Sequence, residues 1–369
     1  MKLSDVCVIN PKSQDINDST PISFIAMPDV SEDGRINTSV IRSFGEVKRG
    51  YTTFQEGDVL FAKITPCMEN GKGAQALGLK NGIGVGSTEF HVLRPIPDKI
   101  DGKWLYYLTA WPAFRHEAEI HMTGSAGQKR VPKSFLESYQ IGIPTLIEQK
   151  DQVSHLNRIR KIIESRQRQL HTLDTLIKAR FVEMTESSTT VRVRMGDVAT
   201  YINGYAFKPT DWTTEGLPII RIQNLNDKTA PYNHYSGTVD SKYRVYSGDI
   251  LVSWATHLEA YVWEGGDAWL NQHIFRVIFD KMPINKIYFV YSTEEALRQA
   301  FRNAHGFKPT MEHIKRSDFE DAVIELPPIG VQDQFAVFVS QVDKSKLAVQ
   351  EALDKAQLLF DSLMQQYFG

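Results

Sequence analysis

The second half of this chain repeats the sequence pattern of its first half, and this duplication constrains the fold more than any other feature. Matched positions lie about 192 residues apart early in the copies and about 183 apart later, so the second copy lacks about nine residues in its middle. Such self-similarity indicates a tandem duplication of about 185 residues per copy, and two copies suit a protein that contacts two sites. The matched segments are 3–6 with 195–198, 54–60 with 245–251, 106–124 with 289–306, and 136–149 with 319–332.

Composition and charge narrow the classes of protein that such a chain can be. Hydrophobic residues make up 42% of the 369 residues, enough for the cores of two or three domains. The net charge of -2 argues against a protein that coats nucleic acid non-specifically, but it allows a DNA reader with basic residues on one face. Cys7 and Cys67 alone build neither a disulfide framework nor a zinc site, so we expect no metal. Without a bilayer-length apolar run or a signal-like start, we expect a cytoplasmic protein.

Most of each copy is expected to form a mixed α/β domain built on a curved sheet. Short apolar runs bounded by turn residues are typical of strands, and a Gly-Asp pair precedes one such run in each copy. A helix should follow later in each copy. The expected strands are 22–27, 59–63, 217–222 and 250–254, and the expected helices are 104–120 and 287–304.

The end of each copy predicts a long helix with an apolar seam. Residues 148–186 contain no glycine or proline, and apolar side chains recur at every seventh position, which is a coiled-coil pattern. A helix of about 38 residues is about 55 Å long, and two of them packed antiparallel would hold two domains apart with approximate two-fold symmetry. The seam residues are Leu156, Ile163, Leu170, Ile177 and Met184 in the first helix, and Val339, Leu353, Phe360 and Tyr367 in the second.

These patterns divide the chain into four segments. We predict a domain over 1–145, a long helix over 146–186, a second domain over 187–327 and a second long helix over 328–369. The first helix carries an excess of basic residues, whereas the matching part of the second is close to neutral. This basic face is either a solvated surface, a surface that pairs with the second helix, or a surface that follows a phosphate backbone.

The ordered set of motifs resembles the specificity subunits of type I restriction-modification systems. The matching stretches are Gly57–Gly73, Ser87–Pro95, Gly124–Val131 and the Ile143-Pro144 pair before the first long helix. The resemblance spans the whole chain in the order domain, helix, domain, helix. The second copy departs from it at 253–257, which replaces the stretch 63–67 of the first copy, so contact residues do not carry over directly.

The resemblance implies a function in DNA recognition. Each domain would be a target-recognition domain that reads one half of a split DNA sequence, and the helices would act as spacers. Two methyltransferase subunits would be partners that bind S-adenosylmethionine and methylate adenine, and nuclease-translocase subunits are a further partner that the family implies. The chain itself would hold no cofactor and catalyse nothing.

Candidate DNA contacts follow from side-chain chemistry. Phosphates and guanine are contacted by Lys and Arg, whereas adenine favours Asn and Gln. The best candidates are the basic residues in dense polar clusters, namely Lys63, Lys129, Arg130, Lys308 and Arg316. The full set is Lys63, Thr65, Lys72, Gln128, Lys129, Arg130 and Lys133 in the first copy, and His257, Lys308, Thr310, Lys315 and Arg316 in the second.

Two other functions are consistent with parts of the sequence. Asp29, Glu46 and Lys48 imitate the core of a metal-dependent nuclease, in which carboxylates hold the ion and water is activated. The second copy has no acid in the corresponding stretch 222–224, which weakens this alternative. A coiled-coil adaptor without any DNA role is the second alternative. The glycine-rich stretch 82–86 is interpreted as a turn or strand edge, because it lacks the strand–loop–helix setting of a cofactor site.

Overall fold

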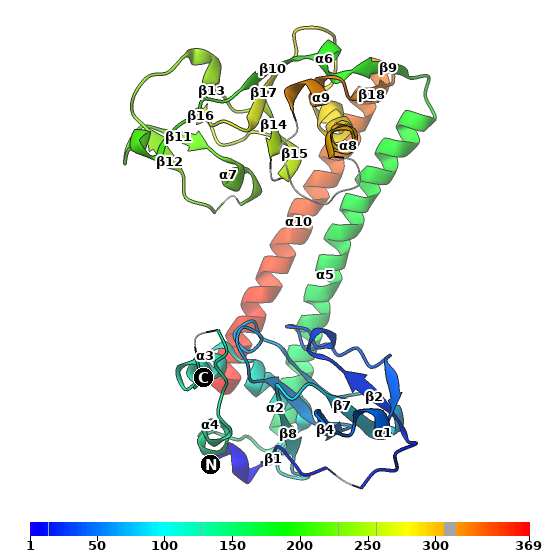
Figure 1. Ribbon diagram of the computed structural model, residues 1–369, viewed down its shortest axis with the longest axis vertical. Coiled ribbons are helices and arrows are strands. Elements are labelled where there is room, and N and C mark those ends of the chain that lie inside the picture. The colour runs from blue at the N-terminus through cyan, green and yellow to red at the C-terminus, as the bar shows by residue number, and fades with distance from the viewer. Residues whose placement is uncertain (14, 126, 228, 256, 306–314) are drawn as a thin grey trace. The chain divides into compact units, whose positions relative to one another are not determined.

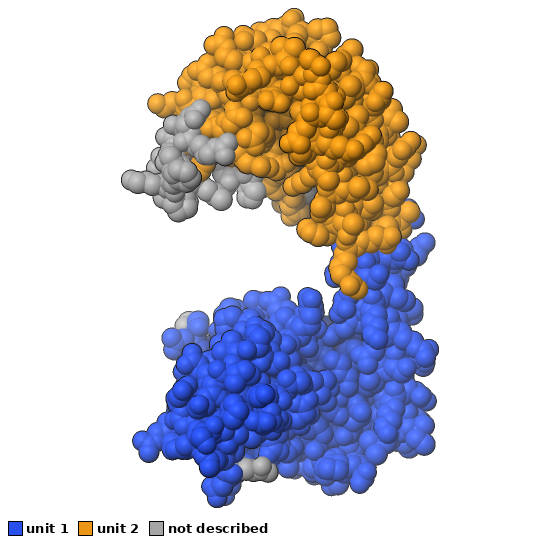
Figure 2. Space-filling model, turned by 90° about the vertical axis from the view of Figure 1, so that its right-hand side faces the viewer, with its two compact units in different colours: residues 1–167, 351–369 blue, residues 168–350 orange. Residues whose placement is uncertain are grey.

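The computed structural model describes residues 1–13, 15–125, 127–227, 229–255, 257–305 and 315–369 (Figure 1). Two compact units are formed, and each contains one copy of the repeat together with parts of both long helices. Unit 1 comprises Met1–Gln167 with Glu351–Gly369, and unit 2 comprises Arg168–Gln350 (Figure 2). Unit 1 therefore combines two segments that are distant in sequence, whereas unit 2 is one continuous stretch.

Unit 1 contains two four-stranded sheets. The first is antiparallel throughout, and in the second the two central strands are parallel. The first sheet runs β1 (Cys7–Ile9), β8 (Phe90–Pro95), β5 (Val59–Ala62), β6 (Gly73–Gln75), and the second runs β3 (Ile41–Ser43), β2 (Pro21–Ile25), β7 (Ile83–Gly86), β4 (Thr52–Gln55). The helices are α1 (Phe44–Val47), α2 (Gly102–Ala110), α3 (Pro112–Ile120) and α4 (Lys133–Ser138), with short 3₁₀ turns at Leu3–Asp5, Met27–Asp29 and Lys80–Gly82.

Unit 2 repeats this topology strand for strand, including the parallel pair at the centre of the second sheet. The first sheet runs β10 (Thr200–Asn203), β17 (Ile274–Ile278), β14 (Ile250–Ala255), β15 (His257–Val262), and the second runs β12 (Asn233–Tyr235), β11 (Leu217–Ile220), β16 (Ala268–Leu270), β13 (Arg244–Val245). Its helices are α6 (Met195–Val198), α7 (Ile222–Asn226), α8 (Lys286–His305) and α9 (Arg316–Glu320), with 3₁₀ turns at Pro209–Asp211 and Ser241–Tyr243, and a further pair β9 (Val191–Arg194) with β18 (Val323–Leu326).

A Gly-Asp turn precedes β5 in unit 1 and the matching strand β14 in unit 2. Gly57 and Gly248 have the same φ of 88°, which glycine adopts without steric cost. The aspartate that follows is bound to an arginine on the neighbouring strand at 2.8 Å, Asp58 to Arg94 and Asp249 to Arg276. This shared turn accounts for the most evident sequence match between the copies.

A buried glutamine ties the start of each long helix to its unit. Gln149 and Gln332 are 0% and 3% exposed. Gln149 accepts the backbone N–H of Asp101, just before α2 (2.7 Å), and Gln332 accepts that of Asn285, just before α8 (3.0 Å). Each side chain also donates to the proline carbonyl five residues earlier, at 2.9 and 2.8 Å. Because buried amides must have partners, these contacts fix where the long helices leave their units.

The long helices are α5 (Leu146–Glu186) and α10 (Ile329–Phe368), and they run antiparallel. In unit 1 the Arg160 guanidinium lies over the Phe360 ring, 5.6 Å from its centre. In unit 2 the Lys346 ammonium is 2.7 Å from the Asp174 carboxylate. All nine seam residues named above are buried or half-buried. In the part of the chain that the structure describes, no helix has the length and apolar character needed to cross a bilayer.

The expected strands are all present, but one expected helix is not. The run 104–120 is split into α2 and α3, because Pro112 lacks a backbone N–H and cannot continue a helix, whereas it suits the first turn of the next one. The counterpart in unit 2 has no proline and forms the single helix α8. The prediction of one helix over 104–120 was wrong.

Candidate nucleic-acid interface

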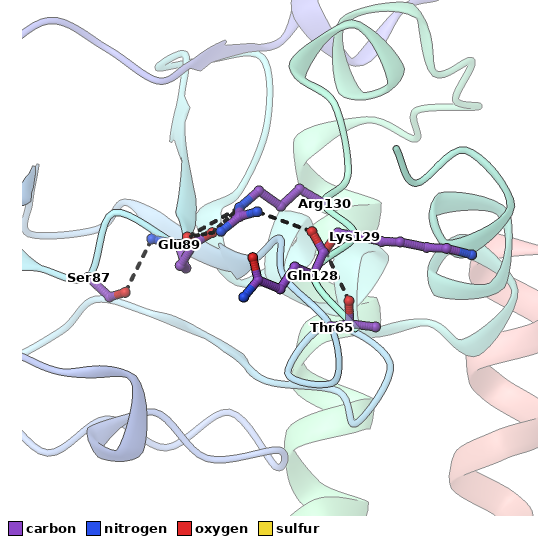
Figure 3. Close-up of polar contacts among 6 residues, drawn as sticks. All are labelled: Thr65, Ser87, Glu89, Gln128, Lys129 and Arg130. Carbon is purple, nitrogen blue, oxygen red and sulfur yellow. Dashed lines mark hydrogen bonds and ion pairs between the residues drawn. The ribbon is translucent and has the colours of Figure 1, made fainter. Parts of the chain in front are cut away.

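Three segments of unit 1 meet at one end of the first sheet: 63–72 after β5, 87–89 before β8, and 121–132 between α3 and α4. The Lys63 N–H donates to the Glu89 carbonyl (2.9 Å), the Val131 N–H to the Lys63 carbonyl (2.9 Å), and the Thr65 N–H to the Lys129 carbonyl (3.1 Å). These bonds bring together five candidates that are distant in sequence, namely Lys63, Thr65, Gln128, Lys129 and Arg130. Figure 3 shows four of them with Glu89 and Ser87.

Lys129 and Arg130 lie in a hairpin-like loop, and their side chains point in opposite directions (Figure 3). Arg130 forms backbone hydrogen bonds in both directions with Thr123, at 2.8 and 3.0 Å. Successive side chains of an extended segment alternate in direction, so only one of the two can face the sheet. Lys129 is exposed, and its ammonium has no partner among the described residues.

Arg130 is engaged with Glu89, which we did not consider as a site residue from the sequence. The Arg130 Nε is 2.9 and 3.2 Å from the two carboxylate oxygens, and one terminal nitrogen is 2.7 Å from Oε1. The other terminal nitrogen donates to the Gln128 carbonyl at 3.1 Å. The hydrogen bonds from Arg130 lower the pKa of the Glu89 carboxyl. The guanidinium is therefore held in one orientation and is not a freely moving positive charge.

Two further candidates in this region have internal partners. The Thr65 hydroxyl donates to the Lys129 carbonyl (3.1 Å), and the Lys72 ammonium donates to the Met27 carbonyl (3.2 Å). Both bonds hold the segment 63–72 in place.

A hollow of about 340 Å³ lies beside Lys63 and is also lined by Tyr51. Basic and aromatic groups next to each other suit contact with a nucleic acid.

The remaining candidates are placed as follows. Lys133 pairs with Glu137 (2.8 Å) and Arg316 with Glu320 (2.8 Å), so the same i,i+4 ion pair occurs in the matching helices α4 and α9. Lys315 precedes α9 and is exposed. His257 lies in β15. Lys308 and Thr310 lie outside the described residues.

Arg115 is a second residue that the sequence did not reveal. It is 7% exposed, lies 5.1 Å from the centre of the Phe61 ring, and donates to the carbonyls of Met68 (2.7 Å) and Lys72 (3.3 Å). Burial lowers its pKa to about 10. In unit 2, β14 and β15 pair up to Ala255 and His257, so there is no comparable loop to hold. The matching arginine there, Arg298, is exposed and binds glutamates of its own helix.

Replacing Arg115 by methionine should destabilise the chain. The side-chain volume is retained, but two loop carbonyls lose their partner, and we expect the free energy of unfolding to fall by about 2–4 kcal/mol. Arg298→Met, the matched change in unit 2, removes only exposed ion pairs and should alter it by less than about 0.5 kcal/mol. Chemical denaturation measures the free energy of unfolding of both variants. Equal decreases in the two variants would show that Arg115 stabilises the chain no more than Arg298 does.

The nuclease arrangement is not supported by the contacts of its residues. The Asp29 carboxylate accepts the backbone N–H of Ala26 at 2.8 Å and so closes a 3₁₀ turn, and the Lys48 ammonium is bound to Asp18. Within the described ranges, no three His, Cys, Asp or Glu side chains are grouped so that they could hold a metal ion.

Comparison with known proteins identifies the class. The family described as "Type I restriction modification DNA specificity domain" matches residues 1–174 and again 188–357, once for each repeat. The chain therefore belongs to this family, which confirms the resemblance found in the sequence. The description of this family, and the names of two relatives that are both specificity subunits, agree with the prediction of a recognition subunit rather than an enzyme.

Two curated relatives come from Escherichia coli. The specificity subunit of the type I restriction enzyme EcoEI is 41% identical over 191 residues, covering 50% of this chain and 32% of the relative. That of EcoAI is 45% identical over 175 residues, covering 47% and 30%. The chain thus matches about a third of the length of these relatives.

Solved structures share the fold. The S subunit of a type I restriction-modification system from M. genitalium gives a TM-score of 0.55 at 12% identity, covering 100% of this chain and 95% of that one. A chain from a study of complex assembly and conformational transition of the type I R-M system gives 0.63 at 17% identity, covering 100% and 96%.

Proposed function

We propose that this chain is the DNA-recognition subunit of a type I restriction-modification enzyme, and that each repeat reads one half of a bipartite site. The observation that supports this most is one domain topology that occurs twice with different loops. Unit 1 has the segment 63–72 between β5 and β6, whereas in unit 2 a single residue separates β14 from β15. Two domains that share one fold but differ in their loops suit the recognition of two different sequences at two sites.

The proposed contacts divide into two kinds. Lys63, Lys129 and Lys133 in unit 1, with Lys308, Lys315 and Arg316 in unit 2, would contact phosphates, which position a protein without reading sequence. Gln128 in unit 1 and His257 and Thr310 in unit 2 would approach base edges. Thr65 and Lys72 would act by holding the loop that carries these groups, because their own polar atoms have internal partners.

Lys129→Ala tests the phosphate contacts. The loss of one phosphate contact should reduce the slope of log K against log salt concentration by about 0.9. Lys80→Ala removes another exposed lysine of unit 1, in the 3₁₀ turn Lys80–Gly82 outside the three segments that meet at Arg130, and should leave the slope unchanged. The slopes are measured by titrating a duplex with the full chain, in complex with its methyltransferase, over a range of salt concentrations. Equal slopes for both variants would show that Lys129 only faces solvent.

We further propose that two methyltransferase subunits dock on the long helices and supply the S-adenosylmethionine, and that nuclease-translocase subunits can join them. Exposed apolar side chains on α5 and α10 occur in both units, as two docking sites require. They are Ile162 (47% exposed), Leu358 (72%) and Leu359 (51%) in unit 1, and Leu176 (46%), Val182 (50%), Val337 (59%) and Leu347 (66%) in unit 2.

The mass of the complex tests this stoichiometry. We expect two methyltransferases per chain, and one after Leu358→Asp with Leu359→Asp, because a charge on a buried apolar contact is costly. Lys355→Asp changes the charge at an exposed polar position of the same helix and should leave two. A wild-type complex with a single methyltransferase would contradict the proposal.

A further inference from the structure

The hydrogen bonds of Arg130 leave a defined pair of donors. A guanidinium has five N–H groups. The Nε–H and one N–H of a terminal nitrogen bind the Glu89 carboxylate, and one N–H of the other terminal nitrogen binds the Gln128 carbonyl. One N–H thus remains on each terminal nitrogen, and neither has a partner among the described residues. Arg130 therefore presents a two-pronged donor fork.

This fork is fixed in place before any ligand arrives. The backbone of Arg130 is bound to Thr123, the guanidinium is bound on two sides, and the side chain is still 42% exposed. Glu89 is itself held, because its backbone N–H donates to the Ser87 hydroxyl (3.2 Å) and its carbonyl accepts from Lys63. A pre-organised donor pair loses little conformational entropy on binding, which suits a specific contact.

The charge around the fork indicates what it binds. Glu89 balances the charge of Arg130, so a phosphate at the fork would also meet a carboxylate that repels it. A neutral group with two adjacent acceptors meets no such repulsion. In the major groove only guanine offers two acceptors, O6 and N7, whereas adenine places an amino donor beside its N7 and cytosine offers an amino donor.

We propose that Arg130 reads a guanine in the half-site of the first repeat through its two remaining N–H groups, and that Glu89 is a positioning residue that orients the fork. This inference rests on the proposed function, and it adds the base that is read and the residues that read it. Lys129, on the opposite side of the same loop, would at the same time contact the backbone. The loop 121–132 would thus combine a phosphate contact from Lys129 with base contacts from Gln128 and Arg130.

The test uses the full chain with its methyltransferase and duplexes in which each position of the first half-site is varied. Arg130→Lys keeps the charge but loses the planar fork, and it should lower the preference for guanine at one position by roughly tenfold or more. Preferences elsewhere, including the whole second half-site, should not change. Glu89→Gln should reduce the preference for guanine at the same position to a smaller extent. If Arg130→Lys disturbs the fold, the base preferences of Glu89→Gln test the inference in its place. Lys129→Ala should weaken binding to all duplexes alike.

A base analogue makes the assignment atom-specific. With 7-deazaguanine, which lacks the N7 acceptor, at that position, binding to the wild-type chain should weaken, and binding to Arg130→Lys should weaken no further. A first half-site without a G·C pair, or variants that weaken all duplexes equally, would overturn the inference. A wild-type chain that selects no sequence at all would instead overturn the proposed function, so the two failures are distinguishable.

Discussion

Exchanging residues 1–142 for the corresponding domain of a relative with another specificity should change one half of the methylated motif completely and leave the other half as it was. The exchanged segment contains both sheets of unit 1 and the loop cluster around Arg130. Gly142 is a suitable junction, because a side chain added there would meet no neighbouring atom within 4 Å. Unit 2 keeps its own core and loops, so the base preferences of the second half-site should be retained.

The exchange succeeds only if the new domain still fits the first long helix. Gln149 receives a hydrogen bond from the Asp101 backbone, and Arg160 donates to the carbonyl of Asp33 (2.6 Å) and to the hydroxyl of Tyr106 (3.2 Å). The new domain should therefore come from a relative that has a tyrosine at the position of Tyr106. A domain without this tyrosine serves as the control for a poor fit to the first long helix. The readout is the motif mapped by sequencing that detects methylated adenine. Changes in both halves would contradict the assignment of one half-site to each repeat.

Removing one helical turn from both long helices should shorten the unspecified gap between the half-sites. Deletion of 164–167 from α5 with 353–356 from α10 removes facing segments, judged from the contact of Arg160 with Phe360. Four residues shorten a helix by about 6 Å, which corresponds to one or two base pairs at about 3.4 Å each. Four residues also make close to one turn, so the apolar seams stay near their register.

The deletion in α5 alone is the matched control. It leaves α10 unshortened, so the facing seams no longer match, and we expect a weaker complex without a defined new gap. The paired deletion should yield the same two half-sites with the shorter gap. An unchanged gap at full activity would show that α5 and α10 do not set the spacing.

The regular elements were predictable because their signals are local. The apolar seam of α5 and α10 follows a seven-residue period, and all nine of its named residues are buried or half-buried. The repeat itself predicted that both copies share one fold, and the two four-stranded sheets of each unit have the same strand order. The break at Pro112 was also visible in the sequence, but the apolar pattern on both sides of it suggested one helix.

The candidate site was only partly predictable because its contacts are long-range. The polar clusters led to Lys63, Lys129 and Arg130, which do lie close together. Glu89 is 41 positions from Arg130, and Arg115 is 43 positions from Lys72, so neither partnership has a local signal. A charged residue on a helix is usually solvent-exposed. Burial of Arg115 is favourable because of its contacts with the carbonyls of the loop after β5 and with the Phe61 ring.

The central claim is that two similar domains in one chain read two different half-sites, and the methylated motif of the unaltered protein tests it most directly. The chain is expressed with its methyltransferase in cells that lack adenine methylation, and the modified positions are mapped across the genome. The account predicts one motif with two specified parts of different sequence, separated by a gap of fixed length in which any base occurs. A single continuous motif, or methylation that does not depend on this chain, would contradict it.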